Sequence, residues 1–568
     1  MKQASSHATA DPIASNAIGS PPSGQVSGLS ITDPRLAIFL SMSNAERTRA
    51  LTAMLGGNAG EKFRQEVTGW IVQRLSVERL VPQTYAKWRP VVREAMLFFG
   101  SHLSTPRLVP KVIEQIELAP DTLPEVRLLR LIAKVPALQK LGQVIARNRH
   151  LHPAVRRELT QLENGVCDVT MDDIHRIIVQ ELGPKLERYA VEIEYKIFSE
   201  ASVSAVVRFT WYNPRSQERE HGVFKVLKPY VREYFAEEMD LLAQLAAHLG
   251  AKHEEYGFAE HVLSDTFEDV RRLLQHEVRF RREQAHLGEA SRLYGSCDAI
   301  RIPQVIRSLC TSTITALTLE TGEKITKAAV RVPKWRRARI AGQLTEAVIA
   351  VPLLASGKKS LFHADPHAGN VLYSNQTGTL TLLDWALTAH IDEQQRRQLA
   401  LLFIMTALRD PDGVCAAIEA LSPGAGKRNT SRTRIIRQQV RQFFADQPLL
   451  RLPQAVDVMD LLERIAWQGV RLPSNLIMLR KVVFTLDGIV HELAGTDASM
   501  EMVIARQLLR QWLKSPINVG WPLSARDWVA VSWSAIFYGS RVALGIARQL
   551  SSVPSNPSGI ADTIVQSA

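Results

Sequence analysis

The chain has 568 residues, and its 69 Lys and Arg against 57 Asp and Glu give a formal net charge of +12. Hydrophobic residues make up 46% and charged residues 22%, which is typical of a globular protein and excludes a wholly disordered, collagenous or disulfide-stapled chain. The positive charge favours anionic partners such as nucleotides, phospholipid headgroups or nucleic acid, but does not choose among them.

The N-terminal segment has an unusual composition. Residues 1–32 are rich in Ser, Ala, Gly and Pro and contain no apolar run of the kind that a secretory signal requires. This composition offers too little apolar surface to bury, so it predicts a disordered tail over 1–32. The four cysteines of the chain lie far apart and form no CxxC pair, so a reducing, cytoplasmic compartment is the expectation.

The pattern after the tail is helical, and it predicts a helical extension over 33–182. The stretch 123–148 is strongly apolar at helical spacing. Four prolines are expected to break this region into short helices: Pro106, Pro110, Pro120 and Pro124.

Strand signals begin only after Gly183. Residues 191–197 alternate apolar and charged side chains, as a half-buried strand does, and 204–212 and 222–227 are further candidates. These segments predict three antiparallel strands, which precede a long helical stretch over 231–293.

The second half of the chain returns to helices. A strand pair is predicted within 302–319, helices over 326–356, and a loop–strand unit over 362–389, with helices from there to the end. Strands followed mainly by helices indicate a two-lobed α+β architecture.

The most specific motif, LFHADPHAGNVLY, runs from residue 361 to 373, and LTLLDW follows at 380–385. A hairpin of the two apolar strands would bring Asp365, Asn370 and Asp384 to one end of a small cleft. Amide and carboxylate oxygens suit Mg²⁺, and a further carboxylate can orient an attacking hydroxyl or water. Together these groups are the set that phosphoryl transfer uses.

Two other interpretations of this motif stay open. Asp-Pro and Gly-Asn are common in turns, so the polar residues could be solvated turn residues. His363, Asp365 and His367 could instead bind a transition metal, although no further His-rich segment supplies a third strong ligand. In the remaining interpretation the two histidines hold the loop by hydrogen bonds.

A lysine inside a predicted strand is the second candidate. Lys225 lies in the apolar strand 222–227, and a phosphate-binding lysine in such a place needs a carboxylate partner, for which the long helical stretch offers Glu277 and Glu283. Alone, Lys225 would be an exposed strand lysine. No glycine-rich phosphate loop precedes it; a Ser- and Ala-rich segment at 199–205 takes that place, where β-carbons limit the approach of phosphate to the backbone.

These residues resemble a family, the UbiB/AarF-type atypical kinases, which have a protein-kinase-like fold and are linked to ubiquinone biosynthesis. KLGQ at 140–143 looks like the family's KxGQ signature, and HADPHAGN at 363–370 is similar to its HADPHPGN. Residues 201–202 lie where the family has its Ala-rich loop, and Lys225 is similar to its strand lysine.

The resemblance implies an α+β, two-lobed protein-kinase-like fold. A helical extension with the KxGQ-like segment would occupy 33–182, and an N-lobe with a small antiparallel sheet would occupy 183–322. A helical C-lobe would follow over 323–510, and an apolar or amphipathic helix with a tail over 511–568.

The resemblance also implies ATP and Mg²⁺ as cofactors and assigns roles to residues of this chain. The catalytic residues would be Asp365, Lys225 and Glu283; the nucleotide-binding residues Lys225, Ala201, Ser202 and Glu320; the metal ligands Asn370 and Asp384; and the regulatory residues Lys140, Gln143 and Glu277. The extension would fold over the active site with Lys140 facing Glu277, which favours an ATPase or small-molecule kinase over a protein kinase.

The chain departs from the family at several motifs, of which two bear most on activity. Asp384-Trp385-Ala386 replaces Asp-Phe-Gly, and Glu277-Val278-Arg279 replaces Glu-x-Asp. These departures motivate an alternative, a nucleotide-binding pseudokinase scaffold. Asp384-Trp385 also resembles aminoglycoside and choline kinases, so a small-molecule phosphotransferase is the other alternative.

The expected setting is prenylquinone or isoprenoid lipid metabolism at a membrane. Residues 528–540 are free of charge, but Arg541 follows, and the stretch is shorter than the roughly 20 residues that span a bilayer. A polar stripe that includes Ser534 and Tyr538 predicts a helix that lies on a membrane or docks on protein, or else a marginal span with this stripe against protein. The expectation is peripheral or weak anchoring at the inner membrane. A lipid or isoprenoid molecule and an anionic membrane surface are expected partners; no nucleic-acid motif is present, and the pattern is silent on oligomeric state.

Overall fold

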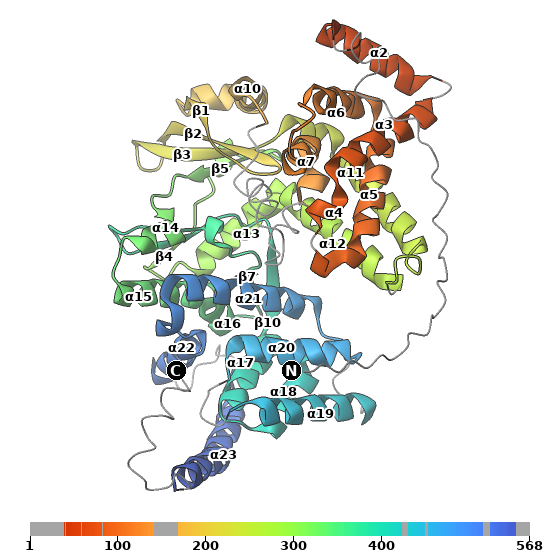
Figure 1. The fold of residues 1–568 in the computed structure, drawn as a ribbon. Helices are drawn as coiled ribbons and strands as arrows, with labels where there is room; N and C mark the ends of the chain where they lie inside the picture. Colours follow the sequence, from red (N-terminus) through yellow and green to blue (C-terminus); the bar gives the residue numbers. More distant parts are fainter. Residues whose placement is uncertain are drawn as a thin grey trace, which may run out of the picture. The chain divides into compact units, whose positions relative to one another are not determined.

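The computed structural model describes residues 39, 41–57, 60–81, 83–140, 168–258, 260–422, 430–448, 453–514 and 523–551 (Figure 1). The chain divides into two compact units, residues 1–162 with 236–268, and residues 163–235 with 269–568. The tail predicted over 1–32 and Gln143 lie outside the described residues.

The first unit is helical. Its helices are α2 (Asn44–Gly56), α3 (Gly60–Leu75), α4 (Val77–Leu80), α5 (Arg89–His102), α6 (Thr105–Glu117) and α7 (Pro124–Ile132), with parts of α11 (Pro229–Ala251) and α12 (Glu260–Glu277). Pro106 and Pro124 lie in the first turns of α6 and α7, where proline starts a helix because its missing N–H has no partner there in any case. Pro110 was expected to break the chain, but α6 continues through it.

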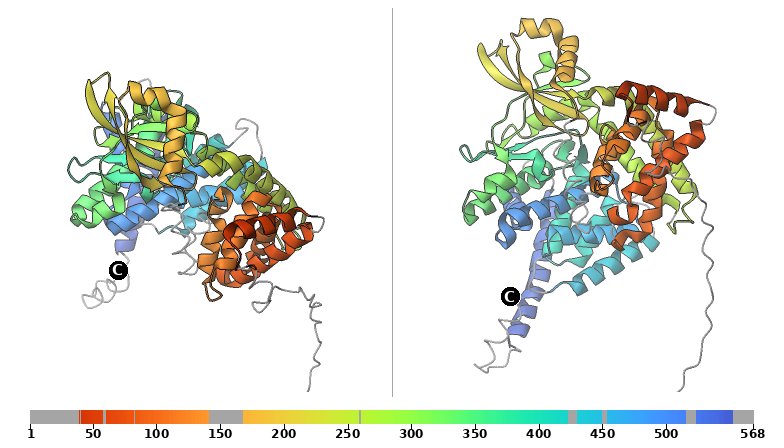
Figure 2. Two further views of the ribbon diagram at one scale, coloured as in Figure 1. Left: turned by 90° about the horizontal axis from the view of Figure 1, so that it is seen from above. Right: turned by 45° about the horizontal axis from the view of Figure 1, so that its top comes forward.

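The second unit begins with a four-stranded antiparallel sheet in the order β1-β2-β3-β5. Its strands are β1 (Glu192–Glu200), β2 (Ser204–Asn213), β3 (Glu218–Leu227) and β5 (Ile314–Thr318), and α10 (Met171–Arg188) lies against them (Figures 1 and 2). Ile174, Ile178 and Leu182 recur every fourth residue on α10 and pack into the core under the sheet. The three predicted strands are therefore present, with β5 as a fourth.

The pairing of β5 differs from the expectation. A strand pair was predicted within 302–319, but β5 pairs with β3, and only the single bridge Val305–Leu317 joins the two ends of that segment. The reason is burial: Ile314 and Ala316 are fully buried, and the sheet offers them an apolar face that a local hairpin would not.

Short strands follow in two groups. They are β4 (Ile300–Arg301), β6 (Glu323–Lys324), β7 (Lys359–His363), β8 (Val371–Tyr373), β9 (Leu380–Leu382) and β10 (Thr388–Asp392). One group is a sheet in the order β4-β9-β8-β6, and the other is the pair β10-β7. The hairpin β8–β9 and the end of β7 carry the loop motif found in the sequence.

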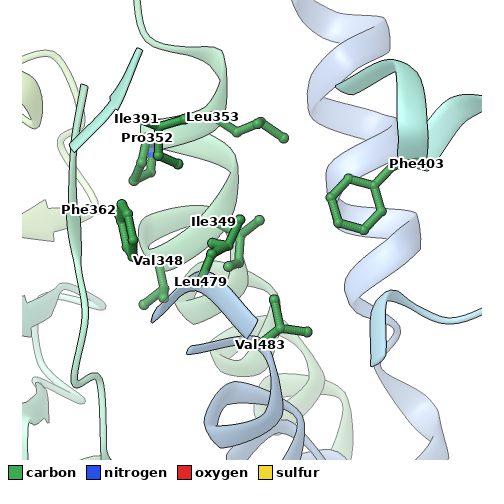
Figure 3. Close-up of a pocket in the computed structure, with 9 residues that line it drawn as sticks. All are labelled: Val348, Ile349, Pro352, Leu353, Phe362, Ile391, Phe403, Leu479 and Val483. Carbon is green, nitrogen blue, oxygen red and sulfur yellow. The ribbon is translucent and has the colours of Figure 1, made fainter. Parts of the chain in front are cut away.

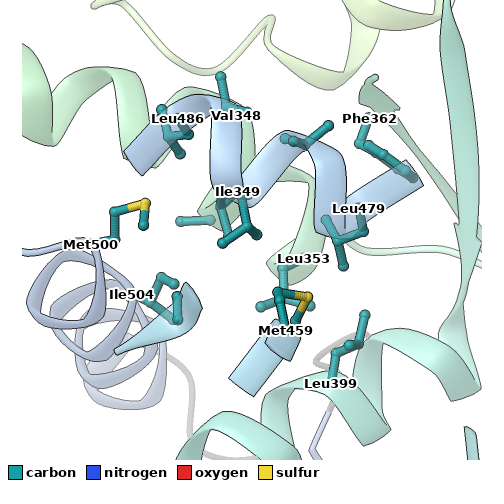
Figure 4. Close-up of a cluster of buried hydrophobic side chains, with 14 of the residues drawn as sticks. Val348, Ile349, Leu353, Phe362, Leu399, Met459, Leu479, Leu486, Met500 and Ile504 are labelled. Carbon is teal, nitrogen blue, oxygen red and sulfur yellow. The ribbon is translucent and has the colours of Figure 1, made fainter. Parts of the chain in front are cut away.

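The remaining helices form the rest of the second unit. They are α13 (Phe280–Leu293), α14 (Ile325–Val330), α15 (Lys334–Thr345), α16 (Val351–Leu354), α17 (Glu393–Ala407), α18 (Pro411–Leu421), α19 (Thr430–Asp446), α20 (Ala455–Trp467), α21 (Ser474–Ala494), α22 (Met500–Lys514) and α23 (Ala525–Ser551). Their apolar faces meet in one large core, where Met459, Leu479 and Leu486 pack with Val348 and Phe362 (Figure 4).

This architecture bears on the predicted fold class and on the question of a membrane-spanning helix. The chain is a mixed α+β protein, mostly helical with small, largely antiparallel sheets, which confirms the predicted fold class. None of the helices in the described part of the chain combines the length and apolarity needed to cross a membrane.

Candidate active site

The loop after β7 is held by a buried histidine. His363 is fully buried; its Nε2 donates to the carbonyl oxygen of Leu383 at 2.8 Å, and its Nδ1 accepts the N–H of Asp365 at 3.2 Å. This pattern assigns the neutral Nε2–H tautomer, because the backbone N–H of Asp365 can only donate. Burial lowers the pKa of His363, in keeping with a neutral ring.

The rest of the loop is held by its own polar groups. Gly369 N donates to His367 Nδ1 at 3.1 Å, Asn370 N donates to the carbonyl of His367 at 2.9 Å, and Asn370 Nδ2 donates to the carbonyl of Asp365 at 3.2 Å. Both histidines thus do what the loop-holding interpretation expects. In the part of the chain that the structure describes, no three His, Cys, Asp or Glu side chains are grouped for a metal ion.

Asp384 follows β9 in an uncommon backbone conformation. Its φ is +55°, in the left-handed region that residues other than glycine seldom adopt. Leu383 N donates to the carbonyl of Asn370 at 2.8 Å, so the hairpin brings the backbones of Asn370 and Asp384 together. Ala386 is outside the left-handed region, so the glycine of Asp-Phe-Gly is not needed in this conformation.

Lys225 joins the strand side of the site to the loop side. Its Nζ lies 2.8 and 2.9 Å from the two carboxylate oxygens of Glu283 on α13, and 3.4 Å from Asp384 Oδ1. The side chain of Lys225 is 14% exposed, that of Glu283 3%, and that of Asp384 43%. Of the two helix glutamates offered by the sequence, Glu283 is thus the one that contacts the lysine.

The charged groups of this cluster shift one another's pKa values. Burial alone would lower the pKa of Lys225, but Asp384 and Glu283 raise it above its usual value. Burial raises the pKa of Glu283 to about 7 against the pull of the lysine. Loss of hydration would raise the pKa of Asp384 as well, but Lys225 outweighs it and the pKa falls to about 2. Asp384 is therefore ionised at neutral pH, as a metal ligand must be.

The Ala201–Ser202 segment forms the turn between β1 and β2. Ala201 is exposed, and its N–H donates to the carbonyl of Ser204 at 2.8 Å, so this amide is already used within the turn. Ser202 is buried; its Oγ donates to Glu277 Oε2 at 3.2 Å, and its carbonyl accepts the hydroxyl of Tyr230. Glu277 thus contacts the turn.

A buried lysine next to this turn was missed in the sequence. Lys228 is fully buried and its Nζ lies 2.7 Å from Asp168 Oδ1 and 2.9 Å from Glu200 Oε2. Asp168 also accepts the hydroxyl of Tyr230 at 2.9 Å. The apolar strand before Lys228 gave a signal of burial, but nothing in the sequence pointed to a partner 60 residues upstream.

Another missed residue reaches the loop from α21. Lys481 Nζ donates to Asp365 Oδ1 at 3.0 Å. Asp365 is largely buried, with 17% of its side chain exposed, whereas the lysine is 44% exposed. No motif marks Lys481, since it is one cation in a long amphipathic helix.

The remaining candidates lie apart from this cluster. Glu320 follows β5, where it accepts the hydroxyl of Thr318 at 2.9 Å, and among the described residues no hydrogen bond or ion pair joins it to Lys225. Lys140 is buried in the first unit, whereas Glu277 belongs to the second, so their predicted pairing stays a prediction.

The first unit holds the segment just before Lys140 by a buried carboxylate. Glu238 on α11 is fully buried, pairs with Arg107, and accepts the N–H of Ala137 at 2.7 Å. Burial raises the pKa of Glu238 to about 7 although Arg107 and this hydrogen bond act in the opposite direction.

An apolar pocket lies beneath the loop, within the helical core (Figure 3). Phe362 on β7 and Leu479 and Val483 on α21 line it, with Phe403 from α17. None of its nine lining residues is polar or belongs to the lysine–carboxylate cluster, so the pocket is part of the packing that supports the loop.

A small antiparallel sheet carries a lysine paired with a helix glutamate, and the loops of the helical part bring in Asp365, Asn370 and Asp384. This arrangement defines the class, a kinase-like domain. Residues 161–418 match the model of the ABC1 atypical kinase-like domain. The match supports, for this part of the chain, the UbiB/ABC1 resemblance that the motifs indicated.

Individual relatives are distant. The chain is 26% identical over 364 residues to the chloroplastic protein ACTIVITY OF BC1 COMPLEX KINASE 7 of Arabidopsis thaliana, covering 62% of this chain but only 50% of that one. It is 21% identical over 397 residues to the probable protein kinase UbiB of Haemophilus ducreyi, covering 69% and 71%. A solved complex of Rv3197 with erythromycin from Mycobacterium tuberculosis is similar with a TM-score of 0.42 and 17% identity, over 64% of this chain and 89% of that chain.

Proposed function

We propose that the protein is an ATP- and Mg²⁺-dependent atypical kinase or ATPase of UbiB type. The observation that carries this proposal is the three-way contact in which Lys225 lies within 3.4 Å of both Glu283 and Asp384. A lysine held by a helix glutamate beside an ionised aspartate is the arrangement that binds nucleotide phosphates and their metal ion in kinases.

Each residue has a separate task in this proposal. Glu283 holds the Lys225 ammonium where the phosphates bind, and the phosphates replace Asp384 as its second partner. Asn370 and Asp384 are the Mg²⁺ ligands, a set that suits this ion because it keeps few protein ligands. Bound Mg²⁺ neutralises charge on the phosphate oxygens. Asp365 accepts a hydrogen bond from the attacking hydroxyl or water and so orients it.

The proposed setting is prenylquinone or isoprenoid lipid metabolism at a membrane surface, cytoplasmic and peripheral. The family resemblance supports the lipid class, and α23 supports the location. Trp533, Ile536 and Phe537 on this helix are more than half exposed, which is unusual for three large apolar side chains so close together. A lipid or isoprenoid molecule would be the acceptor, or water in an ATPase.

The test is thermal unfolding of the native chain with ATP, in the presence and absence of Mg²⁺. A ligand at 100 times its Kd stabilises the folded state by about 2.7 kcal/mol, so a clear rise in Tm is expected with ATP and Mg²⁺ together. Asp384→Asn should lose the Mg²⁺-dependent part of this rise, because it removes the ionised ligand. Asp298→Asn, an exposed aspartate outside the cluster, is the matched control.

Turnover separates an enzyme from a scaffold. Asp365→Asn should bind ATP and Mg²⁺ but release phosphate at least about 100-fold more slowly, because general acid–base groups contribute about 10²–10⁴-fold. A native chain that binds ATP without any turnover would support the pseudokinase scaffold. Absence of a thermal shift with every nucleotide would overturn the proposal.

A further inference from the structure

A second cation, besides Lys225, contacts a carboxylate of the site. Lys481 on α21 donates to Asp365 Oδ1 at 3.0 Å, and 44% of its side chain is exposed. The matched ABC1 domain ends at residue 418, so this lysine comes from beyond it. Its ammonium therefore contacts the loop carboxylate, while its side chain stays partly exposed to solvent.

The rotation of α21 about its axis determines where Lys481 points. Buried residues recur along this helix at spacings of three and four: Leu479, Val482, Val483 and Leu486. They face the core that is drawn in Figure 4, and Leu479 and Val483 also line the pocket of Figure 3. Residue 481 lies about 200° from residue 479 at 100° per residue, which puts it on the opposite face. Core packing thus presents the lysine to the loop.

The start of α21 is also tied to the strands that carry the loop. Asn475 Nδ2 donates to the carbonyl of His390 on β10 at 2.9 Å. Strand β10 pairs with β7, with Thr388 opposite His363, and the loop with Asp365 follows directly. The helix and the loop are therefore held together by more than the ion pair itself.

The charges of the site favour a cation beside Asp365. Lys225 contacts Glu283 and Asp384, whereas Lys481 contacts Asp365. A nucleotide carries its highest negative charge at its terminal phosphate, and a carboxylate without a cation would repel that group. A carboxylate that must lie next to a transferred phosphoryl group needs a neutralising partner that can also reach the phosphate.

We propose that Lys481 is a nucleotide-binding residue of the site: it holds the Asp365 carboxylate in position and contacts the terminal phosphate of the bound nucleoside triphosphate. The inference rests on the proposed function, because it takes Asp365 to lie beside the transferred group. It predicts discrimination between nucleoside triphosphate and diphosphate, since only the triphosphate carries the group that Lys481 would contact.

The experiment compares the Kd of ATP and of ADP, each with Mg²⁺, by calorimetry on the full chain. Lys481→Met should weaken ATP binding about tenfold, the size expected for one charge-assisted contact, and leave ADP binding nearly unchanged. Lys481→Arg should retain most of the ATP affinity, because it keeps the charge. Lys327→Met on α14, an exposed lysine of the same unit, is the matched control and should bind both nucleotides like the native chain.

A double variant tests the role of the Asp365 carboxylate. Asp365→Asn combined with Lys481→Met should recover part of the lost ATP affinity, because the repulsive carboxylate is then absent. If Lys481 were only structural, the double variant would give no such recovery. Loss of the lysine would then lower Tm and weaken the binding of ATP and of ADP equally.

The outcomes also separate this inference from the proposed function. Native-like ATP affinity of Lys481→Met, or equal loss of ATP and ADP, would overturn the inference while the Asp384-dependent binding stands. A native chain that binds neither nucleotide would overturn both.

Discussion

Trp385 shows how the residue after the candidate metal ligand is used in this chain. Its side chain is fully buried, its Nε1 donates to the carbonyl of Leu382 at 3.1 Å, and its ring packs edge-on against His363 at 4.9 Å. Its own carbonyl accepts from His286 Nδ1 at 3.0 Å. Trp385 therefore fixes the backbone next to Asp384, and a site so held needs no glycine hinge to present that carboxylate.

The buried His363 predicts a pH dependence of stability. Burial lowers its pKa below the ordinary value of 6.5, so its contribution to stability is complete above about pH 6.5 and is lost as the pH falls through that value towards the lower folded-state pKa. Protonation would also place an N–H at Nδ1 against the donating N–H of Asp365. The Tm advantage of the native chain over His363→Gln should therefore shrink between pH 8 and pH 5.

The control for this prediction is an exposed histidine. His491→Gln lies near the end of α21 on the surface, and its Tm should follow the native curve at every pH. Parallel curves for the native chain and His363→Gln would contradict the neutral, buried histidine.

Local sequence patterns predicted the loop residues but not their distant partners. Asp365, Asn370 and Asp384 were expected to meet because two short apolar strands with a turn between them can only form a hairpin. The contact between Lys481 and Asp365 joins residues 116 positions apart, and only the burial of one face of α21 determines it. Periodicity reveals that a helix has a core face, but not which loop its other face will meet.

At the scale of elements, the alternation of apolar and polar residues predicted the strands correctly. The predicted pairing of one strand, β5, was wrong. β1, β2 and β3 follow the predicted segments closely because each alternates or is continuously apolar. The predicted helical stretch 231–293 is three helices, α11, α12 and α13, since apolar periodicity persists across their short connections. The partner of β5 depends on the sheet as a whole, which no local pattern contains.

Helix α23 has two opposite faces. Asp527 is paired with Arg397 of α17 at 2.7 Å, and Ser534 donates to Asp410, the residue that caps α18, at 2.5 Å. This polar face packs against α17 and the start of α18, which agrees with the predicted polar stripe. The other face is apolar and exposed over residues 529, 533, 536 and 537.

The exposed face of α23 predicts binding to an anionic membrane surface. The native chain should co-sediment with vesicles of phosphatidylcholine and phosphatidylglycerol, and more weakly with phosphatidylcholine alone, because its net charge is +12. Trp533→Gln combined with Ile536→Gln and Phe537→Gln should lower vesicle affinity at least about tenfold, since each large apolar side chain contributes about 1.5–3 kcal/mol on full burial.

Exposed apolar residues on other helices provide the control for the vesicle-binding experiment on α23. Trp467→Gln with Ile477→Gln removes two side chains of similar exposure on α20 and α21 and should leave vesicle binding unchanged. Equal vesicle binding by the native chain and the α23 triple variant would exclude this helix as the membrane contact.

At the scale of the whole molecule, α11 is one continuous helix whose residues belong to both units. It begins four residues after Lys225, at Pro229, and it carries Glu238, which accepts the N–H of Ala137 in the segment that leads to Lys140. A covalent helix therefore connects the strand of the candidate site with the segment that the family resemblance assigns to regulation.

This connection predicts that nucleotide binding is sensed in the first unit. With ATP and Mg²⁺, amide hydrogen exchange should slow not only at β3 and the loop before Trp385 but also at residues 133–140, while α2 stays unchanged. Glu238→Gln keeps the volume of the side chain but weakens its pairing with Arg107, so it should reduce the response at 133–140 and leave protection at β3 intact. Unchanged exchange at 133–140 in the native chain, alongside clear protection at β3, would mean that the segment before Lys140 does not respond to the site.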